Sequence, residues 1–187
     1  MSAPRIELPA WAVEYAAGVG PCPGDPERMA VAVELARRNV LENSGGPFGA
    51  ALFAEASGEL VAVGVNSVER LNNSVLHAEL MALMHAEARL DRFNLRAPAG
   101  AGFALYSSCA PCAMCLGGIL WSGVGTLVYA AGKADAAAIG FDEGPVFPES
   151  WAYLEARGVS VRAGVLGDEA RAVLELYRAR GGLIYNG

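Results

Sequence analysis

Three of the four cysteines lie within seven residues, in the stretch CAPCAMC that runs from Cys109 to Cys115. In a cytosolic chain such a cluster indicates metal or redox chemistry more often than disulfides. An iron–sulfur run of this spacing would place its fourth cysteine where Ile119 stands. The remaining cysteine, Cys22, is far away in the sequence. The spacing therefore disfavours an iron–sulfur cluster.

Zinc fits the cluster better. A helix that begins at Pro111 would place Cys112 and Cys115 on one face, where the helix dipole lowers the pKa of a thiol. A catalytic zinc takes three protein ligands and keeps a position open for water. We expect one of the two histidines of the chain to be the third ligand. Two alternatives remain open at this point: three buried and inert cysteines, and a closed structural zinc site that also uses Cys109.

The two histidines lie eight residues apart in HAELMALMHAE, a stretch that contains the triplet HAE twice. The expected helix carries an apolar stripe made of Leu80, Met81, Met84 and Ala88. His77 starts the helix on the face of this stripe, whereas His85 lies about 80° around the helix and about 12 Å further along its axis. One zinc ion cannot readily take both. We therefore expect His77 to bind the metal and His85 to be a partly exposed surface residue.

Glu79 follows His77 by two residues, in the first turn of the expected helix. Residues at this spacing do not share a helix face, but in a first turn both side chains can reach over the helix end. A glutamate placed there would touch the water on the zinc rather than the zinc itself. The triplet HAE alone does not indicate a zinc site. Together with PCAMC about 35 residues later it becomes a strong signal for one.

The two stretches match the pattern H-x-E followed by P-C-x-x-C of the zinc-dependent nucleobase deaminases. Further matching segments are Gly46-Pro47-Phe48-Gly49-Ala50, Asn66, 112–118, Trp121, Tyr129-Ala130-Ala131, Asp135-Ala136-Ala137 and Gly140-Phe141-Asp142-Glu143. Over roughly residues 27–150, the chain resembles the bacterial guanine deaminases of the cytidine-deaminase fold. The segment from Gly140 to Glu143 is the part that points to guanine.

The resemblance implies a role for each matching residue. His77, Cys112 and Cys115 would bind Zn²⁺, and Glu79 would be the proton shuttle. The base would meet Asn66 and Ala78 in the binding pocket, with Glu143 at the amino edge that reacts. The resemblance also implies a homodimer, and a C-terminal segment, here with Leu183-Ile184-Tyr185, that closes the active site.

The reaction implied by the resemblance is the hydrolysis of guanine to xanthine and ammonia. Zinc lowers the pKa of a bound water to about 7. Glu79 would take the proton of that water and pass it to N3 of guanine while the oxygen adds to C2, because burial tunes a carboxyl group to act as base and then as acid. Glu143 would hold the amino group and relay a second proton. Phe48, Phe141 and Trp121 are candidates to line or stack on the flat base, and Tyr185 is a further substrate-binding candidate.

The expected elements alternate between helices and strands. Helices are expected over 25–39, 77–92, 111–122, 133–139, 149–157 and 168–180, and strands over 48–54, 59–65, 103–106, 125–130 and 159–162. This order predicts a three-layer α/β/α fold, with a mixed sheet of about five strands covered by helices on both faces. We expect one domain over residues 1–187, with an irregular lead-in over 1–24 and a tail over 181–187.

Composition limits the possible partners. The chain has 187 residues, a net charge of −6 and 53% hydrophobic residues, which indicates a compact domain and disfavours an electrostatic binder of nucleic acid. The charge-free run over 97–132 is broken by Pro, Ser and Gly, so a cytoplasmic protein without a membrane span is expected. Three rival functions remain: deamination of another free heterocycle such as cytosine or an aminotriazine, deamination of tRNA adenosine, and a non-catalytic zinc module.

Overall fold

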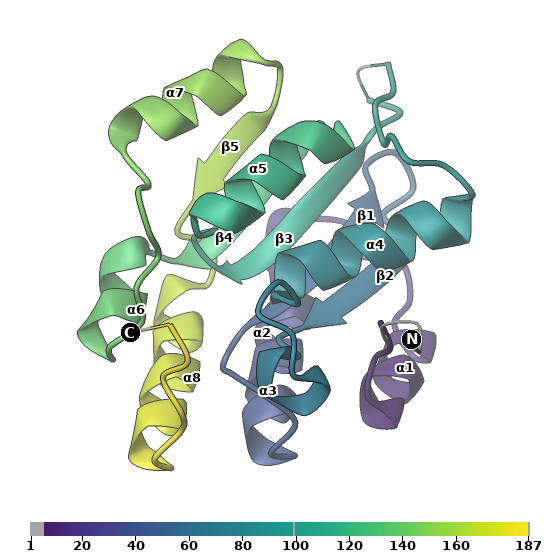
Figure 1. Ribbon diagram of the computed structural model, residues 1–187. Helices are drawn as coiled ribbons and strands as arrows, with labels where there is room; N and C mark the ends of the chain where they lie inside the picture. The colour runs from purple at the N-terminus through teal and green to yellow at the C-terminus, as the bar shows by residue number, and fades with distance from the viewer. Residues whose placement is uncertain (1–5, 99, 187) are drawn as a thin grey trace, which may run out of the picture.

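A five-stranded mixed sheet forms the centre of the molecule, and helices cover both of its faces (Figure 1). The computed structural model describes residues 6–98 and 100–186. The helices are α1 (Ala10–Ala17), α2 (Asp25–Leu41), α3 (Val68–Leu71), α4 (Ala78–Leu90), α5 (Ala113–Ser122), α6 (Lys133–Ala138), α7 (Pro148–Ala156) and α8 (Gly167–Ala179). The strands are β1 (Gly49–Ala54), β2 (Leu60–Val65), β3 (Phe103–Cys109), β4 (Thr126–Ala131) and β5 (Ser160–Ala163). The three-layer α/β/α fold is confirmed.

The strands lie in the order β2-β1-β3-β4-β5. The strand β1 pairs antiparallel with both β2 and β3, whereas β3, β4 and β5 run parallel to one another. The carboxyl ends of β3 and β4 therefore meet at one edge of the sheet. The start of β1 and the end of β2 lie at the same edge, because Gly49 pairs with Val65. Ligands of open α/β sheets bind at such an edge.

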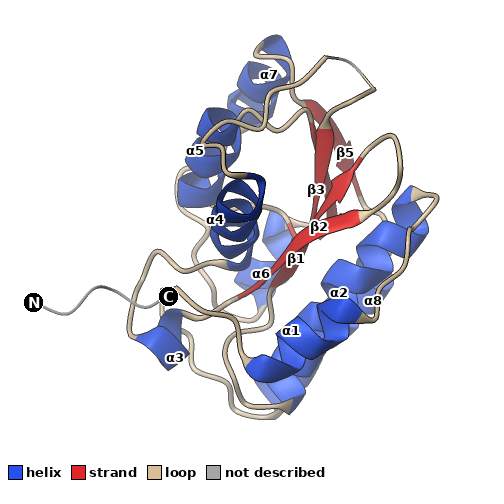
Figure 2. Cartoon of the chain, turned by 90° about the vertical axis from the view of Figure 1, so that its right-hand side faces the viewer, coloured by secondary structure: helices blue, strands red, loops and turns tan. Residues whose placement is uncertain are grey.

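The side chains of each strand alternate between two cores. On β1, Ala51 and Phe53 pack on the side of α2, whereas Ala50 and Leu52 pack on the side of α4. This is the two-residue period of a strand that is buried on both faces. Figure 2 shows the result: α4, α5 and α7 cover one face of the sheet, and α1, α2 and α8 cover the other.

Two glycines let helices approach the sheet closely. A Cβ atom on Gly64 of β2 would lie 2.0 Å from the carbonyl oxygen of Ala78 on α4. A Cβ atom on Gly49 of β1 would lie 2.4 Å from the carbonyl oxygen of Ala32 on α2. Neither position tolerates a side chain unless the helix moves. The depth at which α4 sits on the sheet is therefore set by Gly64.

The expected irregular lead-in over 1–24 is wrong for its middle part, where residues 10–17 form α1. The prolines and glycines that suggested an irregular segment flank this helix: Pro9 precedes it and Gly18 follows it. The helix is held by tertiary contacts, among them a hydrogen bond of 3.1 Å from the indole nitrogen of Trp11 to the hydroxyl of Ser44. The first five residues of the lead-in lie outside the described part of the chain.

Across the described residues, every helix is too short or too polar to cross a lipid bilayer.

Candidate metal and catalytic site

The residues expected to bind zinc lie where two helices begin, at the edge of the sheet described above. His77 is the residue that caps α4, and Cys112 is the residue that caps α5. The helix α5 begins at Ala113, two residues later than expected from Pro111, so Cys112 lies just outside the helix instead of in its first turn. Both caps therefore lie at the positive ends of helix dipoles, which stabilise negatively charged ligands.

The three expected ligands lie together. Nitrogen and sulfur atoms of His77, Cys112 and Cys115 all lie within 4.8 Å of one another, and Nδ1 of His77 lies 3.5 Å from Sγ of Cys112. An imidazole and two thiolates form a donor set that zinc prefers, and three protein ligands leave a position open for water. Cys109 ends β3 with its sulfur 3.8 Å from the carbonyl oxygen of Gly132, outside this group. The closed site with four protein ligands is therefore not formed by the described residues.

The two cysteines share a proton. A hydrogen bond from Cys115, and then the contact with His77, lower the pKa of Cys112 to about 4 against the opposing effect of burial. The same pairing with Cys112, followed by burial, raises the pKa of Cys115. The pair therefore loses its first proton readily, which prepares a thiolate for a metal ion.

Glu79 is buried beside this group. Its Oε1 accepts a hydrogen bond of 3.2 Å from the hydroxyl of Ser107 on β3, and its Oε2 lies 3.4 Å from the sulfur of Cys115. Burial, and then the charge of Cys112, raise the pKa of Glu79. Such a carboxyl group holds a proton at a pH where an exposed glutamate has lost it, as a proton carrier requires. Ser107 has no distinguishing pattern in the sequence, and sequence reasoning missed it.

Glu143 is the second buried carboxyl group of the site, in the loop between α6 and α7. Its carbonyl oxygen accepts a hydrogen bond of 3.0 Å from the amide of Ala113, which fixes the loop to the start of α5. Burial, then the charges of Cys112 and Glu79, raise the pKa of Glu143 to about 7. The site thus holds two carboxyl groups with a raised pKa, and the pKa of Glu143 lies near neutral pH.

Asn66 follows β2 and is fully buried. Its side-chain nitrogen donates a hydrogen bond of 2.7 Å to the hydroxyl of Tyr185, in the C-terminal tail. Its backbone is held from the other side by Asn39 of α2, whose side-chain nitrogen donates to the carbonyl oxygens of Gly46 and Asn66 at 2.8 and 2.9 Å. Sequence reasoning missed Asn39, because a lone asparagine in a helix gives no signal. Gly187, the last residue of the expected tail, lies outside the described residues.

The aromatic candidates divide into two groups. Phe48 and Phe141 meet edge to face at 5.0 Å, and Phe141 lies 5.1 Å from Tyr185. Tyr185 lies 6.0 Å from the ring of His77, so it connects the two phenylalanines to the metal group. Trp121 lies elsewhere, near the far end of α5, and is 75% exposed. The expectation that Trp121 lines the base pocket is therefore wrong within this chain.

His85 lies outside the metal group, as expected from the period of the helix. The face of α4 that is buried differs from the expected stripe. The buried residues of α4 are Ala78, Glu79, Met81, Ala82, Leu83 and Ala86, whereas Leu80, Met84 and Ala88 are at least partly exposed. The small alanines face the sheet, because α4 lies so close to Gly64. Ala78, expected at the substrate, is buried in the first turn between the metal group and β2.

Comparisons with known proteins agree with this geometry. The model of the cytidine and deoxycytidylate deaminase zinc-binding region matches residues 24–131. The guanine deaminase of Bacillus subtilis (strain 168) is 39% identical over 118 residues, which are 63% of this chain and 71% of that protein. A solved structure in complex with 2,6-diaminopurine has a TM-score of 0.91 at 43% identity and covers 98% of this chain and 97% of that one.

The solved guanine deaminase of Nitrosomonas europaea has a TM-score of 0.89 at 42% identity, and the alignment covers 95% of this chain and 97% of that one. The family model accounts for more than half of this chain and includes His77, Glu79 and both cysteines of the metal group. The chain therefore belongs to the family of cytidine and deoxycytidylate deaminases that is defined by this zinc-binding region.

Proposed function

We propose that this chain hydrolyses guanine to xanthine and ammonia. The observation that carries the proposal is that two buried carboxyl groups lie beside one metal group: Oε2 of Glu79 is 3.4 Å from the sulfur of Cys115, and the backbone of Glu143 is hydrogen-bonded to Ala113, the residue after Cys112. Guanine deaminases are among the proteins to which the chain is similar over most of its length, and a purine with a 2-amino group occupies another similar structure.

The roles of the side chains follow from their positions. His77, Cys112 and Cys115 would hold the zinc ion, which lowers the pKa of a bound water when it is present. Glu79 takes a proton from the attacking water and delivers it to N3 of guanine, while the water oxygen forms a bond to C2. The oxygen on C2 then gives up its remaining proton, which passes to the amino nitrogen; the bond from C2 to that nitrogen breaks, and ammonia leaves as the carbonyl group of xanthine forms.

Glu143 and Asn66 hold the base in this proposal. With its pKa near 7, Glu143 is partly protonated at neutral pH, so it can contact the amino group and relay the second proton. Asn66 gives one side-chain N–H to Tyr185 and has a second N–H for the base. Phe48 and Phe141, whose rings meet edge to face, would line the flat base, and Ala78, which is buried in the first turn of α4 next to Glu79, would close the pocket.

Measurement of ammonia release by the zinc-loaded protein tests the proposal. The panel contains guanine, guanosine, adenine, cytosine, an aminotriazine and a tRNA with adenosine at the wobble position. We expect turnover of guanine with the highest kcat/KM, and no turnover of the tRNA, because a net charge of −6 disfavours binding to a polyanion. Inert guanine, together with turnover of cytosine or tRNA, would overturn the proposal in favour of that substrate.

We further propose that the protein acts as a homodimer in the cytoplasm. The homodimer is supported by an apolar surface formed by α5, α7 and the loop before α7, which lie on one side of the sheet (Figure 2). Trp121, Phe147 and Tyr153 are each more than half exposed there, and a single copy leaves this apolar area in water. Light scattering after gel filtration should give twice the mass of one chain, and Trp121→Ser should shift the protein towards the monomer. A wild-type protein that stays monomeric at micromolar concentration contradicts this proposal.

A further inference from the structure

The C-terminal segment, defined here as residues 181–186, returns from α8 to the metal group without regular secondary structure. The hydroxyl of Tyr185, which belongs to this segment, accepts the hydrogen bond from the side-chain nitrogen of Asn66. Because the segment has no helix or strand to hold it, its position depends on the packing of Ile184 and Tyr185 against the core and on hydrogen bonds on both sides of Tyr185. One lies after Tyr185, from the side-chain nitrogen of Asn186 to the carbonyl oxygen of Asp142 at 2.8 Å. The other lies before Tyr185 and involves Tyr177.

Tyr177 lies in the last turns of α8 and is buried. Its hydroxyl donates a hydrogen bond of 2.7 Å to the carbonyl oxygen of Leu183. Its ring stacks on Phe141 at 6.0 Å, and Gly182 lies so close to the same ring that a Cβ there would be 2.3 Å from it. The amide of Gly182 also donates to the carbonyl oxygen of Tyr177 at 3.1 Å. Tyr177 therefore contacts the segment through its ring, its hydroxyl and its backbone.

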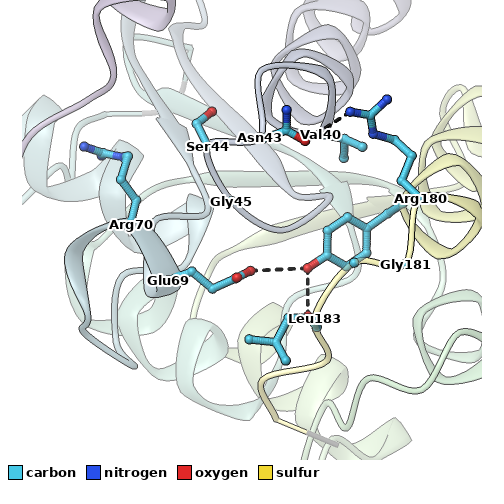
Figure 3. Close-up of a pocket in the computed structure, with 11 residues that line it drawn as sticks. Val40, Asn43, Ser44, Gly45, Glu69, Arg70, Arg180, Gly181 and Leu183 are labelled. Atoms are coloured by element: carbon cyan, nitrogen blue, oxygen red, sulfur yellow. Dashed lines mark hydrogen bonds between the residues drawn. The ribbon is translucent and has the colours of Figure 1, made fainter.

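A second acceptor competes for the same hydroxyl proton. Oε1 of Glu69, on α3, lies 3.3 Å from the Tyr177 oxygen, a longer contact than the one to Leu183. Figure 3 shows both contacts. Beside them, residues of α3, the end of α8 and the loop after α2 line a cavity of about 620 Å³. The hydroxyl has one proton to donate. Burial and the charge of Glu69 raise its pKa, so the proton remains on the oxygen. If Leu183 moves away, Glu69 is in place to accept the hydrogen bond from this hydroxyl.

We propose that Tyr177 is a positioning residue that holds Leu183 in place so that Tyr185 fixes the orientation of the Asn66 side chain. The inference rests on the proposed function, because the expected effect of Tyr177 is on the binding of the base at Asn66. The side chain of Asn66 can rotate about its terminal bond. Its oxygen accepts only long contacts of 3.4 Å from the amides of Gly46 and Val68, so the hydrogen bond of 2.7 Å to Tyr185 is the shortest contact that fixes the amide before the base arrives. Glu69 provides the alternative partner for Tyr177 when the segment opens.

The first test is Tyr177→Phe, which keeps the ring between Phe141 and Gly182 and removes only the hydroxyl. We expect the KM for guanine to rise about 3- to 10-fold, the effect of one net hydrogen bond, with kcat changed by less than about 2-fold. Zinc content and melting temperature should stay at the wild-type values. The control is Tyr15→Phe, which removes the hydroxyl of a partly buried tyrosine on α1 and should leave KM unchanged.

A double variant separates positioning from a general structural role. If Tyr177 acts through Tyr185, then adding Tyr177→Phe to a Tyr185→Phe chain should change KM by less than about 2-fold. An equal loss in both backgrounds would overturn the proposed route.

Hydrogen exchange provides a readout that needs no activity. The amides of residues 183–186 should exchange faster in Tyr177→Phe than in the wild type, and those of β3 and β4 should not change. Unchanged exchange in the segment would overturn the inference even if guanine is turned over. Faster exchange in a protein that does not deaminate guanine would instead contradict the proposed function alone.

Discussion

Two buried carboxyl groups determine what the individual residues of this site can do. Glu79 and Glu143 are both less than a tenth exposed, and burial is the first cause of the raised pKa of each. The two side chains differ in how firmly they are held. Glu79 accepts a hydrogen bond from Ser107 and belongs to a helix, whereas Glu143 lies in a loop. We therefore expect the rigidly held Glu79 to carry out the proton transfer from water, and the loop residue Glu143 to follow the substrate.

Replacement of Glu79 by glutamine should separate catalysis from metal binding. Glutamine has nearly the same shape but cannot carry a proton, so kcat should fall by about 100-fold or more. Zinc content, measured by atomic emission, should stay at one ion per chain. The sequence supplies a matched control in its second HAE triplet: Glu87→Gln removes the same charge and should leave kcat unchanged. Near-normal turnover of Glu79→Gln would refute the assignment.

The same repeat gives a matched pair for the metal. We expect His77→Ala to lose zinc after dialysis against a weak chelator, because only two thiolates of the metal group remain. His85→Ala should keep the wild-type zinc content, since its ring lies outside that group. Loss of one equivalent of zinc from His85→Ala, but not from His77→Ala, would show that the wrong triplet had been assigned.

Glu143 should also make the stability of the metal-free protein depend on pH. Its pKa in the folded chain is raised to about 7, so the folded state favours the protonated form. The stabilisation from this group is complete below the unfolded pKa and is lost as the pH rises through about 7. Glu143→Gln, measured by urea unfolding with a chelator present, should match the wild type at pH 4.5. At pH 8 it should be more stable by up to about 3 kcal/mol. Equal pH dependence in the two proteins would contradict this.

At the residue scale, the metal group could be predicted from the sequence because its residue types are rare. The chain has two histidines and four cysteines, and zinc chemistry restricts the useful combinations to a few. Asn39, Ser107 and Tyr177 are common residue types without a distinguishing spacing. Their roles depend on which segments of the chain meet in the fold, and the sequence alone does not contain that information in readable form.

At the scale of elements, the position of α4 depends on the glycine beneath it. A Cβ on Gly64 would lie 2.0 Å from the carbonyl oxygen of Ala78 and 2.5 Å from the amide nitrogen of Ala82, and both are backbone atoms that cannot rotate away. Gly64→Ala should therefore lower the free energy of unfolding by about 3 kcal/mol. It should also reduce zinc affinity, because α4 carries His77 at its start. Chemical denaturation and a zinc titration measure the two effects.

A control for this substitution is Gly20→Ala, because a Cβ there would meet nothing within 4 Å. It should leave both stability and zinc affinity close to the wild-type values. Wild-type stability in Gly64→Ala would show that α4 can move away from the sheet without penalty, and would contradict the close packing as the reason for the glycine.

The elements differ in how well the sequence predicted them. Strands such as β1 and β4 were clear, because their apolar runs end at glycine or at polar residues. The helix α1 was missed, since Pro and Gly around Ala10–Ala17 suggested a loop. The buried face of α4 was misplaced because large apolar residues were weighted above alanine, whereas a helix packed over a glycine buries its smallest side chains. Close approach between elements is a tertiary property, so it overrides the local pattern.

At the scale of the whole molecule, one side chain joins three elements that are distant in the sequence. Asp25 is the first residue of α2. Its Oδ1 accepts a hydrogen bond of 2.6 Å from the hydroxyl of Tyr106 on β3. Arg162 on β5 donates to both of its oxygens, at 2.7 and 3.0 Å. The contact therefore links the helix layer to the middle and to the edge of the sheet, across 137 residues of chain.

Asp25→Asn should show the strength and the pH dependence of this link. Burial alone would raise the pKa of Asp25, but the hydrogen bonds from Tyr106 and Arg162 lower it overall. The folded state thus favours the charged form, so the stabilisation is present above the unfolded pKa and is lost as the pH falls through the folded pKa. At pH 7, Asp25→Asn should be less stable in urea by about 1–2 kcal/mol, because the pair is partly exposed and solvent weakens it.

The difference between Asp25→Asn and the wild type should shrink as the pH is lowered from 5 towards 3, in chelator-treated protein so that zinc release does not contribute. Asp168→Asn is the control: Asp168 also pairs with an arginine, Arg171, but its side chain is 90% exposed and the two residues lie on the same helix. A solvated pair within one helix does not join elements, so its loss should leave the unfolding curve unchanged. Equal effects of the two substitutions would mean that the link between α2, β3 and β5 adds nothing beyond an ordinary surface charge.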